Sequence, residues 1–270
     1  MAGYSSYDDL IAELTAGKAL RWDFVKVGPA AEAAGNWVSH WYAAGSPGAG
    51  VDPATTPGTA YDDAAGSMNW VDVDPDTKHM LTFGASATVN CTLHLYDRLV
   101  GVAGIALNST GVKTVNSVAL PRYSGAAASA VQAWVEVTTA TATTAPQVRM
   151  NGYTNEAGTG GRTGGSLFFP AAATDIRWMG PLPLQAGDKG VQSVEGLEVQ
   201  TAGSAGVCNV VLLKPLVSLP CVANIWNERD MVLQLAGLDR VFDGASLALM
   251  QLATATTATT IIGTVRIGYG

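Results

Sequence analysis

Three aspartates at alternate positions are the clearest candidates for metal chemistry in the sequence. Asp72, Asp74 and Asp76 lie in VDVDPDTKH, and this spacing opens a calcium-binding loop. The rest of the loop pattern fails, because Thr77 replaces the required glycine and Phe83 replaces the bidentate glutamate. Asp-Pro-Asp is also an ordinary turn sequence. We therefore predict a solvated turn and no metal site, with a structural cation at these aspartates as the alternative.

The other residues with catalytic potential do not form a recognisable site. His40, His79 and His94 lie in unlike settings, and no serine lies in a GxSxG segment. Glu195 and Glu198 are close in sequence, but their odd spacing places them on opposite faces of a strand, whereas a glycosidase pair must share a cleft. The segment EAGTGGRTGG lacks the Gly-Lys-Ser/Thr ending of a phosphate loop. We predict no catalytic residues, no enzymatic activity and no cofactor.

The three cysteines show no metal-binding pattern. Cys91, Cys208 and Cys221 include no CxxC pair and no zinc spacing. The segment MAGYSSYDDL lacks the basic and apolar parts of a signal peptide, so we expect reduced thiols made in a cytoplasm. A disulfide between Cys208 and Cys221 is the alternative.

Few of the 270 residues are charged. Charged side chains make up 14% of the sequence, against roughly 25% in an ordinary soluble domain, and the net charge is −7. Because affinity for nucleic acid comes mainly from Lys and Arg on phosphates, we predict no direct nucleic-acid binding. Lys214, Pro215 and Pro220 interrupt the most apolar segment, which favours buried strands over a membrane helix, and we predict no membrane partner.

A short helix is expected near the N-terminus, in SSYDDLIAELTAGK. Ser6 can cap it, and Gly17 marks its end. Leu10, Ile11 and Leu14 share one face, which must be buried on this subunit or on a neighbour because so short a helix is marginal alone in water. We take these three residues as candidate contacts with another protein.

Residues 20–80 lack a clear period and are rich in Gly and Pro, which indicates extended, irregular chain. Such a segment either lies on a partner or pads one side of the core. We add Trp22, Trp37 and Trp41 to the candidate protein contacts. The expected organisation is a helix and extended arm over residues 1–80 and a β body over residues 81–270.

A period of two residues dominates after residue 80. Four segments each place two strand-like runs around a stretch of small residues, as in VQAWVEVTTATATTAPQVRMNGY and SLALMQLATATTATTIIGTVRIGY. Strings of Thr and Ala can pass through strand ends and bends without adding bulk or charge. The expected fold is mainly β, an antiparallel β-sandwich of jelly-roll type. Arg162, alone among glycines, is a further candidate contact, reaching an acidic group on a neighbouring subunit.

YSSYDDLIAELTAGK, GNWVSHWYAAGSPGAG and DVDPDTKHMLTFGASATVNCTLHLYDRLVG together resemble virion structural proteins of tailed bacteriophages in overall style. The resemblance implies a non-enzymatic capsid decoration (cement) or minor capsid protein, made in the host cytoplasm and located in the virion. Its partners would be the major capsid protein and copies of itself in a homo-oligomer. The alternatives are a tail, baseplate or fibre-associated subunit, and a carbohydrate-binding module that recognises the host by stacking sugars on its tryptophans.

Overall fold

The computed structural model describes residues 4–28, 34–170, 176–232 and 238–270. Strands predominate, and the helical elements in these ranges are the α-helix α1 and the 3-10 helix η1 (Gly125–Ala130). The prediction of a mainly β protein is confirmed. The finer prediction of a jelly-roll sandwich stays a prediction. No helix within the described ranges is long and apolar enough to span a membrane.

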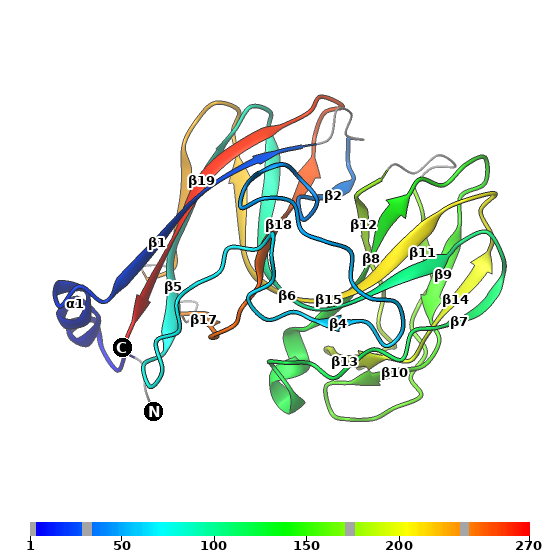
Figure 1. Cartoon of the computed structure of the whole chain (residues 1–270), viewed down its shortest axis with the longest axis horizontal. Helices are drawn as coiled ribbons and strands as arrows, with labels where there is room; N and C mark the ends of the chain where they lie inside the picture. Colours follow the sequence, from blue (N-terminus) through cyan, green and yellow to red (C-terminus); the bar gives the residue numbers. More distant parts are fainter. Residues whose placement is uncertain (1–3, 29–33, 171–175, 233–237) are drawn as a thin grey trace.

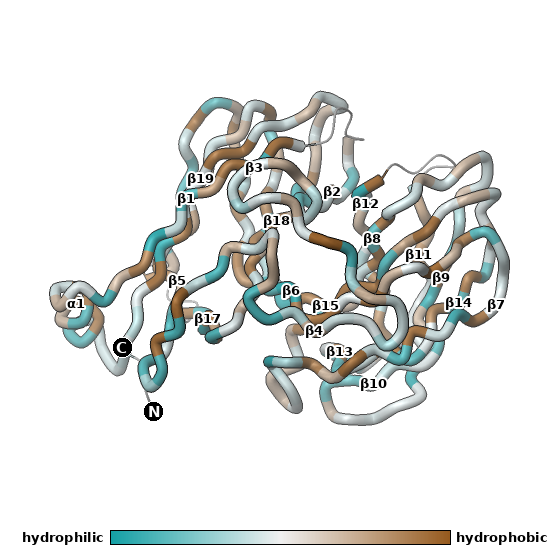
Figure 2. The backbone as a smooth tube through the Cα atoms, viewed as in Figure 1, coloured by the Kyte–Doolittle hydropathy of each residue, from teal (hydrophilic) through white to brown (hydrophobic). Residues whose placement is uncertain are grey.

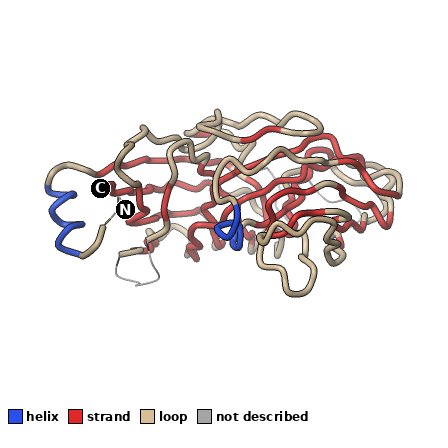
Figure 3. Tube along the Cα trace, turned by 90° about the horizontal axis from the view of Figure 1, so that it is seen from below, coloured by secondary structure: helices blue, strands red, loops and turns tan. Residues whose placement is uncertain are grey.

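The helix α1 (Tyr7–Thr15) begins at the cap residue expected from the sequence. Ser6 Oγ accepts the backbone N–H of Asp9 at 3.1 Å, which satisfies one of the free donors at the helix start. The helix ends before Gly17, whose φ of +84° suits glycine. Figure 3 shows α1 at one end of the molecule, close to both termini.

The centre of the fold is a closed ring of antiparallel strands. The two longest strands, β6 and β15, pair with each other along one edge of each strand. Four more strands link their other edges, so that the six strands form a closed ring. In order, the ring consists of β15 (Val207–Cys221), β8 (Gln132–Thr139), β12 (Trp178–Pro181), β2 (Trp37–Ser39), β18 (Leu247–Ala253) and β6 (Cys91–Ala106), and β4 (Thr59–Ala60) pairs with β6 outside it. Closure satisfies the edge hydrogen bonds that an open sheet leaves exposed.

Two further sheets flank the ring, one at each side in Figure 1. The β19 sheet, at the left, contains β16 (Asn227–Asp230), β5 (Lys78–Ala87), β19 (Thr260–Tyr269), β1 (Ala19–Val27) and β3 (Gly45–Ser46), with β17 (Arg240–Val241) also paired to β5. The β14 sheet, at the right, contains β11 (Leu167–Phe168), β9 (Gln147–Met150), β14 (Gly196–Thr201) and β7 (Gly111–Thr114). A small pair, β10 (Tyr153–Asn155) with β13 (Val191–Val194), lies below it.

β6 and β15 serve both flanking sheets. Leu93 and Leu95 of β6 belong to the core under the β19 sheet, whereas Val100 and Val102 of the same strand belong to the core under the β14 sheet. The β6–β15 ladder contains register shifts at three places. Such bulges bend a strand and increase its twist, which lets one pair of strands face two different partners.

The small-residue strings predicted as corners connect different sheets. The string TTATATTAP leads from β8 in the ring to β9 in the β14 sheet, and TATTATT leads from β18 in the ring to β19 in the β19 sheet. The other two predicted units, β5 to β6 and β14 to β15, also cross between a flanking sheet and the ring. None of these four units is a hairpin, because the two strands of each unit do not pair with each other.

Much of the expected N-terminal arm lies inside the fold. Within residues 20–80, β1 pairs along its whole length with β19, and Trp41 and Tyr61 join the apolar cluster inside the ring. This part of the arm therefore packs against the core of its own chain. The expected boundary between residues 80 and 81 falls inside β5 (Lys78–Ala87), and the division into arm and body stays a prediction.

Candidate functional site

A buried ion pair lies inside the ring, between β6 and β8. Arg98 Nη2 is 2.7 Å from Glu136 Oε2, Nη1 is 3.3 Å from Oε1, and both side chains are fully buried. The guanidinium carbon of Arg98 lies 4.6 Å from the ring centroid of Trp41 and 5.1 Å from that of Tyr61. Burial alone would lower the pKa of Arg98, but the Glu136 carboxylate, together with Tyr61 and Tyr96, outweighs burial and holds this pKa above its usual range.

Polar side chains of the arm complete this network, which we call the ring network (Arg98, Glu136, Tyr42, Asp52 and Asn209). Tyr42 Oη donates to Asp52 at 2.7 Å and lies 3.4 Å from Glu136 Oε2. Asn209 Nδ2 donates to Tyr42 Oη at 3.0 Å and to Asp52 Oδ1 at 3.1 Å. Burial and the Glu136 carboxylate raise the pKa of Tyr42, so its hydroxyl stays protonated. The network fastens the arm to the ring.

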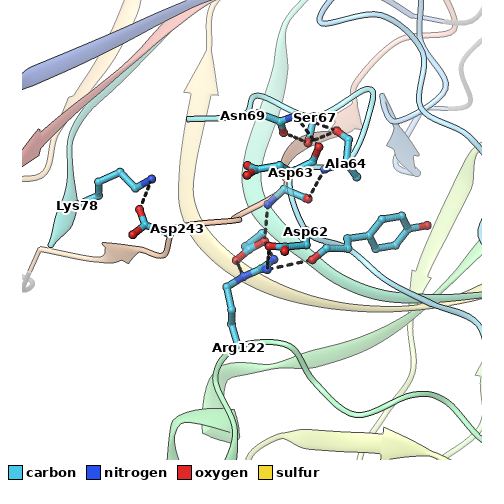
Figure 4. A network of polar contacts seen from close by, with 11 residues as sticks. Asp62, Asp63, Ala64, Ser67, Asn69, Lys78, Arg122 and Asp243 are labelled. Atoms are coloured by element: carbon cyan, nitrogen blue, oxygen red, sulfur yellow. Dashed lines mark hydrogen bonds and ion pairs between the residues drawn. The ribbon is translucent and has the colours of Figure 1, made fainter. Parts of the chain in front are cut away.

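A second polar network joins β6 to the segments around it (Figure 4). Arg122 binds Asp97 through two hydrogen bonds, Nη2 to Oδ1 at 2.7 Å and Nε to Oδ2 at 3.0 Å, and donates to the Tyr61 carbonyl at 2.9 Å. The backbone N–H of Ser246 also donates to Asp97, at 3.0 Å. Burial raises the pKa of Asp97, and Arg122 opposes that shift. Because Arg122 and Asp97 bind each other and also bind backbone groups of the same chain, the network holds these segments together. We call it the Arg122 clasp (Arg122, Asp97, Tyr61 and Ser246).

Lys78 and Asp243 form a separate pair beside that clasp (Figure 4). The Lys78 side chain is 1% exposed, and its Nζ lies 2.6 Å from Asp243 Oδ1 and donates to the Val71 carbonyl at 2.9 Å. The pair holds the start of β5 against the segment after β17. These ion pairs were not predicted from the sequence, although charged residues within apolar strands, as in LHLYDRLV and AWVEV, were a visible signal.

The alternate aspartates do not assemble a metal site. Asp76 Oδ2 lies 2.9 Å from Lys18 Nζ, and Asp72 and Asp74 are exposed. In the part of the chain that the structure describes, no three His, Cys, Asp or Glu side chains are grouped so as to hold a metal ion.

The expected helix contacts differ in exposure. Ile11 is 60% exposed, Leu14 is half-buried, and Leu10 is buried. Leu10 lines a cavity of about 460 Å³ between α1 and the segment after β16, together with Tyr4, Tyr7 and Met231. The helix therefore packs on its own subunit through Leu10 and presents Ile11 outward.

The expected tryptophan contacts lie mostly inside. The exposure expected of Trp41 is wrong, because its side chain is 1% exposed and its Nε1 donates to the Val51 carbonyl at 3.0 Å. Trp22 and Trp37 are half-buried. Their neighbours are aromatic rings of the same chain. The ring centroid of Trp70 lies 6.0 Å from that of Trp22, and the centroids of His94 and Trp134 lie 4.5 Å and 6.1 Å from that of Trp37. A contact role for Trp22 and Trp37 stays a prediction.

Arg162 forms its ion pair within the chain. Its Nη2 lies 2.8 Å from Asp188 Oδ1 and its Nε lies 3.0 Å from Oδ2. Asp188 also accepts hydrogen bonds from Tyr153 Oη and Asn155 Nδ2. Arg162, followed by these donors, holds the pKa of Asp188 well below its usual range. The acidic partner of Arg162 was expected on a neighbouring subunit, and in the structure it is Asp188 of the same chain.

Comparison with known proteins leaves the family open. No family model matches the sequence, and no curated protein matches it. Among solved structures, the VP1 pentamer of Human Polyomavirus 7 is 11% identical over 94% of this chain and 96% of that chain, with a TM-score of 0.18. The VP1 pentamer of Human Polyomavirus 6 is 10% identical over 93% and 94%, with a TM-score of 0.17. Similarity this weak carries no argument about fold or function.

The outer face of the β19 sheet exposes apolar side chains. Val25 and Val27 of β1 and Ile262 of β19 are 40%, 43% and 48% exposed, and Val25 is paired directly with Ile262 across the two strands. The strands β1 and β19 run side by side in Figure 2. The indole of Trp226, 49% exposed, lies over Gly84 of the adjacent strand β5. We call these residues the outer patch (Val25, Val27, Ile262 and Trp226).

No disulfide joins the three cysteines, and two of them are neighbours. Cys91 of β6 and Cys221 of β15 face each other directly across the ladder, whereas Cys208 lies opposite Ile105 and Val137. The alternative of a Cys208–Cys221 disulfide is wrong, because one extended strand separates these two residues.

Stability is expected to fall as the pH is lowered from about 6.5 towards about 4, because His40 is buried in its neutral form. Burial lowers its pKa from 6.5 to about 4, and Nε2 is hydrogen-bonded to Gln251 at 2.8 Å. Within this window the unfolded chain binds a proton that the folded protein excludes, which favours unfolding. Urea unfolding at several pH values checks this, with a slope from His40 approaching about 1.4 kcal/mol per pH unit.

The variant His40→Gln isolates this contribution from those of His79 and His94, whose pKa values burial also lowers. Its stability should vary less with pH across the same window. Equal pH dependence in the variant and the wild type would show that His40 is not the source.

Proposed function

We propose that this protein is a non-enzymatic structural subunit of a virus particle, of the capsid decoration (cement) or minor capsid type. The segments that resemble tailed-phage virion proteins support the proposal, and so does the low charge of the chain. In this proposal the fold is a jelly-roll sandwich elaborated by the ring. The protein stabilises the head by contacting the major capsid protein and copies of itself.

The observation that carries the proposal is the outer patch. Three of its members, Val25, Val27 and Ile262, sit side by side on two paired strands rather than singly. When another protein covers a sheet face with exposed apolar side chains, the free energy falls by about 25 cal/mol per Å² of apolar surface removed from water. The ion pairs described above serve a different purpose, because their charges are already paired within the chain and hold the subunit rigid.

Binding of this kind stabilises a particle by mass action. A subunit that binds the assembled head but not its separated components adds its binding free energy to the stability of the head. A rigid subunit binds more tightly than a mobile one, because less conformational entropy is lost at the contact. The ring network and the Arg122 clasp supply this rigidity.

The test is cosedimentation of the purified protein with intact and emptied heads of the virus that encodes it. We expect binding in a fixed ratio and a higher melting temperature of the heads. Ile262→Glu, which places a charge in the outer patch, should weaken binding by roughly tenfold or more. The matched control is Val112→Glu on β7, a valine that is 57% exposed in the β14 sheet. It should bind heads as the wild type does.

Three results would contradict the proposal. Failure to bind heads while joining tails would support the tail, baseplate or fibre alternative. Adsorption to host glycans, abolished by Trp226→Ala, would support the carbohydrate-binding alternative. Equal weakening by the Ile262 and Val112 variants would show that the outer patch is not the contact.

A further inference from the structure

We propose that Cys91 and Cys221 are a cross-strand thiol pair that closes to a disulfide when the protein meets a peroxide. Cys91 is the first residue of β6 and Cys221 is the last residue of β15. They are direct partners in the antiparallel ladder, and the Cys91 side chain is hydrogen-bonded to the Cys221 thiol. The pairing is a property of the β6–β15 register, because 129 residues lie between them in sequence (221 − 91 − 1).

The geometry requires only a small movement. The Cβ atoms of directly opposite residues in an antiparallel pair are about 4.5–5.5 Å apart, and a disulfide needs about 3.5–4.5 Å. A closure of about 1 Å is within the adjustment available at a strand end. The third cysteine has no such neighbour in the ladder, since Cys208 faces Ile105 and Val137.

The reaction is a two-electron oxidation. The Cys221 thiolate attacks one oxygen of hydrogen peroxide, which gives a sulfenic acid and releases hydroxide, neutralised to water by the thiol proton. Cys91 sulfur then attacks the sulfenic sulfur, the S–S bond forms, and the departing hydroxyl takes the Cys91 proton as a second water. Two thiols are oxidised and one peroxide is reduced to two waters.

The environment distinguishes Cys221 from Cys208. The hydrogen bond from Cys91 lowers the pKa of the Cys221 thiol, whereas burial raises the pKa of Cys208 to about 12. Because the thiolate is the reactive form, Cys221 reacts more readily than Cys208. Both members of the pair are buried, at 3% and 4% exposure, so the oxidant reaches them when the strand ends open locally.

The disulfide would fasten the end of the β6–β15 ladder that supports the β19 sheet. Both cysteines belong to the core under that sheet. The benefit rests on the proposed function: a virion subunit is made in a reducing cytoplasm and is then released into an oxidising medium, where disulfides persist. The subunit would thus assemble with free thiols and gain a covalent link after release.

The test uses the purified full chain and hydrogen peroxide, with thiols counted in denaturant. We expect the count to fall from the three cysteines of the sequence to one. Intact mass should decrease by about 2 Da, and a peptide pair containing Cys91 and Cys221 should appear in the digest. The melting temperature should rise by about 5 °C, and dithiothreitol should reverse every change.

Three variants keep the result interpretable. Cys208→Ala should retain the full response, and Cys91→Ser and Cys221→Ser should each lose it. Because both thiols are buried, peroxide could fail to reach them within the time of the assay. Equilibration in a glutathione redox buffer with mild urea, which promotes local opening, excludes this explanation for a negative result. A count that stays at three there, a linked peptide containing Cys208, or a disulfide between two chains would overturn the proposal. These assays need no particle, so failure to bind heads would leave their outcome unchanged.

Discussion

Glu136→Ala is expected to destabilise the fold by about 3–5 kcal/mol. The substitution leaves the Arg98 guanidinium buried without its carboxylate, beside the rings of Trp41 and Tyr61. An unpaired buried charge costs far more than the net contribution of the pair, because it has lost its hydration and gained nothing in return. Urea unfolding followed by far-UV circular dichroism measures the change.

A double variant distinguishes the cost of leaving Arg98 unpaired from the cost of losing the side chain at position 136. Arg98→Met combined with Glu136→Leu replaces both charges with apolar side chains of similar size and should recover most of the lost stability. If Glu136→Ala alone cost less than about 1 kcal/mol, water would have to reach Arg98, and the closed interior of the ring would be wrong.

The second large effect is expected for Trp41→Ala, at about 3–5 kcal/mol. Trp41 is among the largest fully buried side chains, and it packs inside the ring on Tyr61 at 5.3 Å. Its removal leaves a cavity and deprives the Val51 carbonyl of its donor. Because this indole joins the arm to the ring, amide exchange over residues 41–61 should also accelerate, which hydrogen-exchange mass spectrometry detects.

Trp226→Ala is the matched control, since it removes the same side chain from an exposed position. We expect a stability change below about 1 kcal/mol and no change in exchange over residues 41–61. The comparison also tests the sequence-based choice of Trp41 as a contact residue: a Trp41→Ala protein that folded normally and failed only in assembly would restore that choice.

Local patterns in the sequence were sufficient for some elements. Alternation in TIIGTVRIGY predicts a strand, and β19 buries Ile261, Val265 and Ile267 while exposing Ile262 and Arg266. The capping pattern of SSYDDL predicts the start of α1. In both cases the signal lies within a few residues of the element that it specifies, so neither required knowledge of distant partners.

β1 was missed for an identifiable reason. Its sequence ALRWDFVKV alternates, but the inward positions include Lys26, which is buried and donates to the carbonyls of Ala43 and Gly48 at 3.3 and 3.1 Å. A charged residue at an inward position conceals a period of two residues. The carbonyls that satisfy this lysine come from a loop whose position no local pattern specifies.

The ring network and the cysteine pair depend on register between distant strands. Arg98 and Glu136 each interrupt an apolar run, so the sequence could have marked them as unusual. Their pairing follows only from the closure of the ring through β15, and the pairing of Cys91 with Cys221 follows only from three register shifts along one ladder. A single sequence does not specify such shifts.

The position of β19 imposes an order on how this fold is made. It lies between β1 and β5, although it follows both by most of the length of the chain. The β14 sheet, built from residues 111–201, is complete before β19 leaves the ribosome, whereas β1 has only the two residues of β3 as a partner until then. An apolar strand that waits with free edges can pair with neighbouring chains. Translation speed and chaperone supply, rather than the stability of the finished subunit, would then limit the yield of native protein.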